Sequence, residues 1–186
     1  MLKHSTTKEL VFIALMAASL FIVNFITGAG LVAITGIPLS NMFINSLFLA
    51  LWVFLMVKII PKFWSLTLML LVYSILSVPT FIGGAPGFWL KVPIVTFAGF
   101  LGDIFLYFTK YKSWAIFIAY YILTTATLLT FTFALLKLGI PAADKILPIV
   151  HWLILAICLI GTIGLVLGIF IHSRIKNKRI IQQITS

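Results

Sequence analysis

Six long apolar stretches, separated by short breaks that contain Gly, Pro or Lys, dominate this sequence of 186 residues. Each stretch is close to the roughly 20 apolar residues that an α-helix needs to cross the hydrocarbon core of a membrane. Charged residues make up only 9% of the chain, far fewer than in a soluble domain. The pattern therefore predicts an all-α polytopic membrane protein in which residues 1–186 form a single domain. We expect its six transmembrane helices at 9–28, 38–57, 64–82, 91–109, 114–136 and 148–173.

The basic residues predict how these helices are oriented. If both termini lie in the cytoplasm, ten of the 13 Lys and Arg residues fall on the cytoplasmic side, and only Lys91, Lys137 and Lys145 fall outside. Because cytoplasmic segments of membrane proteins are enriched in Lys and Arg, the sequence predicts cytoplasmic N and C termini. A cleaved signal peptide at the first apolar stretch is the alternative, and it would leave an odd number of spans.

The net charge of +10 would also suit a protein that binds nucleic acid. Such proteins gather Lys and Arg on a polar surface, whereas here these residues are scattered between long apolar runs. We therefore expect no nucleic-acid partner. The basic segments suit the anionic inner surface of a lipid bilayer instead.

Residue patterns typical of enzymes, metal sites and cofactor sites are missing from the sequence. The three histidines are far apart and the single cysteine lies in an apolar run, so no metal-ligand spacing is present. The acidic residues lie in three different regions, which leaves no paired carboxylates for acid–base catalysis. They are Glu9, Asp103 and Asp144. We expect no enzymatic activity, no metal and no cofactor.

The segment FIGGAPGFWLK at 81–91 resembles a phosphate-binding loop but lacks its spacing. A Walker A loop places its Lys directly after the second conserved Gly, whereas three residues separate Gly87 from Lys91 here. The expected topology also places this segment outside, away from cytoplasmic ATP, so the energy source must be another protein or an ion gradient. We interpret the segment as an outer loop that, with the uncharged loop expected at 28–38, folds over the bundle as a gate.

Polar and aromatic residues of the spans gather at the expected outer end. Asn41 and Asn45 are four residues apart and so share one face of a helix, and Asn24 ends the first span at the same level. A few oriented polar groups with aromatic walls suit a small-molecule pocket. We predict a substrate-binding site formed by Asn41, Asn45, Trp89, Lys91, His151 and Trp152.

Each of these residues also has a structural alternative. The Asn side chains could bridge neighbouring helices, and the Trp side chains could belong to the interfacial aromatic belt. Lys91 could extend its ammonium group to the membrane surface, and His151 could be an ordinary interfacial residue. If both line the pocket, they favour an anionic ligand group such as a carboxylate or phosphate.

Asp103 is an acidic residue inside the fourth span, about 9 Å from its expected cytoplasmic end at 1.5 Å per residue. A carboxylate at this depth is costly unless it is paired or reaches water. One interpretation is an ion pair with Lys58, Lys62 or Lys110, and the other is a coupling or proton-relay role.

Small residues mark two helix faces that could be approached closely. Ala14 and Ala18 form an A-x-x-x-A face on the first span, and Gly161, Gly164 and Gly168 form a similar face on the sixth. With ALMAA at 14–18, a basic start, six spans and both termini inside, the whole chain resembles a substrate-binding S component of the energy-coupling factor (ECF) family of vitamin and metal importers.

This resemblance implies high-affinity binding of a small nutrient, a vitamin or related micronutrient, from outside a prokaryotic plasma membrane. It also implies that a membrane T component docks on Ala14 and Ala18 and that two cytoplasmic ATPases drive the protein to topple and release its cargo. Two other functions stay open. One is a stand-alone proton-coupled secondary transporter or channel that uses Asp103, and the other is an assembly subunit without a ligand.

Overall fold

The computed structural model describes residues 6–35, 40–80, 82, 86–138 and 147–175. These residues form six α-helices and one short 3-10 helix, and no strand occurs among them. Five of the helices are long and apolar enough to cross a membrane. The elements are α1 (Thr7–Thr35), α2 (Ser40–Ile59), α3 (Ser65–Ser77), α4 (Lys91–Phe108), α5 (Ser113–Lys137), η1 (Leu147–Ile149) and α7 (Val150–Ile175).

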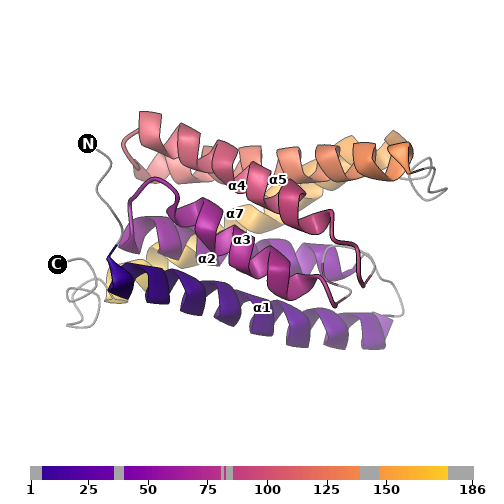
Figure 1. Cartoon of the computed structure of the whole chain (residues 1–186), viewed down its shortest axis with the longest axis horizontal. Coiled ribbons are helices and arrows are strands. Elements are labelled where there is room, and N and C mark those ends of the chain that lie inside the picture. Colours follow the sequence, from indigo (N-terminus) through magenta and orange to yellow (C-terminus); the bar gives the residue numbers. More distant parts are fainter. Residues whose placement is uncertain (1–5, 36–39, 81, 83–85, 139–146, 176–186) are drawn as a thin grey trace.

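The helices pack into one bundle in which successive helices run in opposite directions along the long axis (Figure 1). Around the bundle, neighbours follow the order α1, α2, α7, α5, α4 and α3, and α3 contacts α1 again. Helix α2 also touches α3 and α5, so it is the most enclosed of the long helices. The buried side chains of the described residues are mainly apolar, but polar and charged ones lie among them, including Asn24, Lys91 and Asp103.

The two ends of the bundle are defined by which helices begin and end there. Helix α1 begins and α7 ends at the same end, which we call the terminal end (Figure 1). At the opposite end, which we call the distal end, α1, α3 and α5 finish and α2, α4 and α7 begin. The distal end is the one for which the sequence predicts the substrate-binding site.

Helix α1 is longer than expected, because it continues through Gly28 and Gly30 to Thr35. The expected loop at 28–38 is therefore wrong for residues 28–35, and residues 36–38 lie outside the described part of the chain. A Gly in a helix interior costs only about 1 kcal/mol relative to Ala. In an apolar setting, leaving the helix would cost far more, because the freed backbone groups would have no water to bind.

Helix α3 is shorter than expected, since a span was predicted at 64–82 and the helix covers 13 residues. At 1.5 Å per residue it is about 20 Å long, against about 30 Å for the hydrocarbon core of a bilayer. Pro79 follows two residues after Ser77 and has no N–H to continue the hydrogen-bond ladder. Of the six membrane-crossing helices expected, five are long and apolar enough to cross, and α3 is a shorter apolar helix.

The glycine face predicted on the last span is confirmed in α7. A Cβ atom at Gly164 would collide with the backbone carbonyl oxygen of Leu47 in α2, and one at Gly168 would press on the ring of Phe54. A Cβ atom at Gly161 would collide with the ring of Tyr120 in α5. These glycines therefore allow α7 to lie directly against α2 and α5.

Candidate functional site

Two of the predicted site residues, Asn41 and Asn45, lie in the first turns of α2 at the distal end. The Asn41 side chain is 8% exposed, and Asn45 follows it by one turn on the same face. The side-chain oxygens of both residues are buried and have no hydrogen-bond partner among the described residues. Since buried amide groups are nearly always hydrogen-bonded, these two oxygens require an explanation.

A third asparagine, Asn24 of α1, shows the same feature. Its side chain is 0% exposed, and its Nδ2 donates a hydrogen bond to the hydroxyl oxygen of Tyr73 in α3 at 3.0 Å. Its side-chain oxygen is buried and meets no hydrogen-bond donor in the part of the chain that the structure describes. Tyr73, which no pattern in the sequence marks, therefore binds the Nδ2 side of this amide and leaves the oxygen side open.

The packing of α1 against α2 brings these asparagines together. Asn41 lies directly against Gly28, and at the other end of the contact Trp52 donates its ring N–H to the Ser19 hydroxyl at 2.9 Å. These two contacts fix the register of the antiparallel pair. By this register, Asn45 falls at the level of Asn24, each one turn inward from the contact of Asn41 with Gly28. We call Asn24, Asn41 and Asn45 the amide cluster.

The amide cluster is a buried polar site with spare acceptor capacity. Each side-chain carbonyl oxygen can accept up to two hydrogen bonds. Leaving a buried acceptor unsatisfied costs about 1–3 kcal/mol. The seam contains three such acceptors, one from each asparagine. Such an arrangement is suited to a guest, either water or a ligand, that brings hydrogen-bond donors.

Lys91, which the sequence predicts to bind substrate, is engaged with the backbone instead. It is 2% exposed, and its ammonium group donates to the carbonyl oxygens of Ser77 at 3.2 Å and Thr80 at 2.7 Å. These carbonyls lie at and just beyond the C-terminal end of α3, where a helix lacks internal partners and carries partial negative charge. Lys91 thus closes the end of α3, which is neither of the two roles considered from the sequence.

Asp103 performs the opposite task at the other end of α3. It is fully buried and accepts hydrogen bonds from the Thr67 backbone N–H at 2.8 Å, the Thr67 hydroxyl at 2.6 Å and the Leu66 backbone N–H at 3.4 Å. These groups belong to the first turn of α3, where backbone N–H groups lack internal partners. One of the cations expected to pair with Asp103, Lys62, forms an ion pair with Glu9 of α1 at 2.7 Å.

The Asp103 carboxylate also influences the turn between α4 and α5. Burial, and after it the nearby charge of Asp103, raises the pKa of the Tyr111 hydroxyl above its ordinary value. The Tyr111 oxygen is itself buried, with no hydrogen-bond partner within the described ranges. Tyr111 therefore stays protonated and neutral at physiological pH.

The aromatic residues of the predicted site lie at the surface of the bundle. Trp89 and Trp152 are 67% and 64% exposed, and His151 is exposed beside Trp152 with 5.2 Å between the ring centroids. Exposed Trp rings near the ends of apolar helices are typical of an interfacial belt. The structure thus brings Asn41 and Asn45 together with Asn24, and does not bury Trp89, His151 or Trp152 with them.

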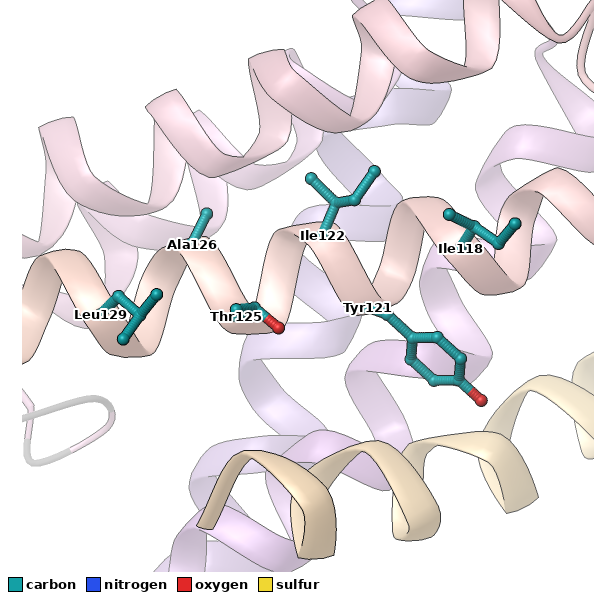
Figure 2. Close-up of a pocket in the computed structure, with 6 residues that line it drawn as sticks. All are labelled: Ile118, Tyr121, Ile122, Thr125, Ala126 and Leu129. Carbon is teal, nitrogen blue, oxygen red and sulfur yellow. The ribbon is translucent and has the colours of Figure 1, made fainter. Parts of the chain in front are cut away.

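A hollow of about 410 Å³ lies elsewhere, along one face of α5 (Figure 2). All of its lining residues belong to α5, so it is a groove on the surface of the bundle and not an enclosed pocket. Its Tyr121 points towards α7 and bonds the Thr162 hydroxyl at 2.8 Å. The groove offers little polar chemistry and suits a lipid chain better than a polar nutrient. The lining residues are Ile118, Tyr121, Ile122, Thr125, Ala126 and Leu129.

The small-residue face predicted on α1 is partly open. Ala14 is exposed at the bundle surface, Ala18 is half-buried, and Ala17 between them is buried in the core. A neighbouring helix could therefore approach α1 closely at Ala14.

Comparison with known proteins adds no relative, because no family model, no curated protein and no solved structure matches the chain. Within the described ranges, no three His, Cys, Asp or Glu side chains come together in a way that could hold a metal ion.

Proposed function

We propose that this chain is the substrate-binding subunit of a membrane importer of the ECF type, with a small nutrient as its cargo. In this proposal both termini are cytoplasmic, as the basic residues indicate, and the distal end of the bundle faces the outside. A nutrient would then reach the amide cluster from outside the cell.

The observation that carries the proposal is the amide cluster itself. Three buried side-chain oxygens, each without a partner among the described residues, lie in one seam at the distal end. A protein whose only task was to assemble others would gain from apolar side chains at these positions, because well-packed apolar groups avoid the desolvation cost. Buried polar groups of this kind favour binding over a purely structural role.

The exposed position of Ala14 on α1 supports the second half of the proposal. A small residue at the surface of an apolar helix allows the backbone of a partner helix to approach closely. The partner proposed for this face is the membrane T component, which would connect the chain to two cytoplasmic ATPases. The chain itself lacks the Walker A pattern, so such partners would supply the energy.

Proton-coupled transport by the chain alone rested on Asp103 as the proton site. Its three hydrogen bonds to the first turn of α3 give this carboxylate a structural role that accounts for its burial. Asp103 therefore no longer favours the alternative.

Affinity purification of the tagged chain from mildly solubilised native membranes tests the proposal. We expect a membrane protein and two ATPases to co-purify, and we expect nutrient uptake by the reconstituted complex to require ATP hydrolysis. Purification of the chain without partners, together with uptake by the chain alone in liposomes under a proton gradient, would contradict the proposal.

A further inference from the structure

We infer that the amide cluster takes an uncharged small molecule that presents N–H or O–H donors, and not an anion. This inference rests on the proposed function and deepens it, because it names the chemical class of the cargo. It concerns Asn24, Asn41 and Asn45 in the seam between α1 and α2, together with Gly28 beside them.

The cluster presents acceptors to a guest. The side-chain oxygens of all three asparagines are buried and accept no hydrogen bond from any described residue, whereas Asn24 Nδ2 is already bound to Tyr73. An oxygen acceptor is satisfied by an N–H or O–H donor and is repelled by a carboxylate or phosphate oxygen. A guest that satisfies these oxygens must therefore bring donors.

The cations proposed for an anionic ligand are not available to one. The ammonium group of Lys91 is buried against the carbonyl oxygens of Ser77 and Thr80 at the end of α3. His151 is exposed at the start of α7, a helix that packs against α2 and α5. Neither of these two described groups offers a compensating charge to an anion at the cluster, so its desolvation would be strongly unfavourable.

Among the described residues, a cationic guest would lack a compensating charge as well. Of the three acidic residues in the chain, Glu9 is paired with Lys62 and Asp103 is bonded to the first turn of α3. The third, Asp144, lies outside the described residues. Since a buried cation needs a paired anion or a full shell of oxygens, the three neutral amide oxygens fit an uncharged donor group better.

The space at the cluster depends on one glycine. A Cβ atom at position 28 would overlap the side-chain amide of Asn41, so only Gly leaves that amide where it is. Gly28 thus permits the arrangement of acceptors and gives a way to disturb it without removing any polar group.

The experiment uses the full chain, purified in detergent after incubation with a small-molecule extract of the cells in which the protein is produced. Mass spectrometry then identifies the compounds released on denaturation from wild type, from the double variant Asn41→Leu with Asn45→Leu, and from Thr27→Val. Thr27 is a matched control, because it lies at the same end of α1 and its hydroxyl already donates to the Val23 carbonyl at 2.7 Å.

We expect wild type and Thr27→Val to release the same uncharged, donor-bearing compound. We expect the double variant to release at least about tenfold less of this compound, because a site that binds through hydrogen bonds loses much of its affinity when they are removed. The melting temperature of the ligand-free double variant should equal or exceed that of wild type, since the two oxygens lose no described partner.

Four outcomes would overturn the inference: release of a carboxylate or phosphate compound, equal release from the double variant, release of no compound from wild type, or a lower melting temperature in the ligand-free double variant. Stabilisation of wild type by sodium or ammonium ions alone, with no effect on the double variant, would replace the uncharged class with a cation. Because the isolated chain is used, these outcomes are distinguishable from a failure to capture partner proteins.

Discussion

The Asn41 side chain lies against Gly28 where α1 packs on α2. This contact connects a glycine inside a helix with the candidate site. Gly is unfavourable in a helix interior, yet Gly28 lies inside the C-terminal half of α1. Its value is the space that it leaves for the Asn41 amide. At the scale of single residues, the chain therefore gives up some helix stability where it holds polar groups in an apolar seam.

The two glycines of α1 provide a direct comparison. Gly28→Ala should destabilise the protein by about 1–3 kcal/mol, because the added methyl group must displace the Asn41 side chain. Gly30→Ala should be neutral or stabilise it by up to about 1 kcal/mol, because a Cβ there meets nothing within 4 Å. Melting temperatures in the same detergent measure both effects. Equal shifts for the two variants would show that the Asn41 contact does not matter.

Helix α3 is held at both ends by its neighbour α4. Asp103 binds the N–H groups at the start of α3, and Lys91 binds the carbonyl groups at its end. Because α3 and α4 are antiparallel, each charge meets the end of the helix dipole that it stabilises. Both ends of this apolar helix, which is too short to cross the membrane, are thus stabilised by charged side chains of α4.

Removal of the Asp103 carboxylate should loosen the start of α3. Asp103→Ala leaves the Leu66 and Thr67 N–H groups without this acceptor, which should cost about 2 kcal/mol or more, and Asp103→Asn should cost less. Hydrogen exchange should quicken at these two amides first. Thr96→Val on the same helix is the control, because the buried Thr96 hydroxyl has no partner among the described residues and should be dispensable. Unchanged exchange in Asp103→Ala would refute this role.

The contact between α7 and α2 should be the least tolerant of added volume. Gly164→Ala would force a methyl group against the Leu47 backbone carbonyl, which cannot move away as a side chain can. We expect a larger loss of stability than for Gly28→Ala, where a side chain yields. Denaturant titration of both variants, followed by Trp fluorescence, would reveal the order. A smaller loss for Gly164→Ala would mean that α7 can shift along α2.

For the molecule as a whole, the sequence predicts the helical class and the positions of α2, α4, α5 and α7 well, because long apolar runs in a bilayer have few alternatives. It does not predict where α1 and α3 end. It does not predict the roles of Lys91 and Asp103, whose partners are backbone groups of α3 and carry no residue signature. Nor does it identify Asn24 and Tyr73 as a pair, since their contact depends on how α1 packs against α3.

The most direct measurement of the central claim compares partner capture by wild type, Ala14→Trp and Ile163→Trp in native membranes. Both positions are exposed on apolar helices, but only Ala14 lies on the proposed docking face of α1. We predict that wild type and Ile163→Trp capture a membrane protein with two ATPases, and that Ala14→Trp captures about tenfold less, a loss of about 1.4 kcal/mol in affinity. Equal capture by all three proteins, or capture by none, would contradict the account.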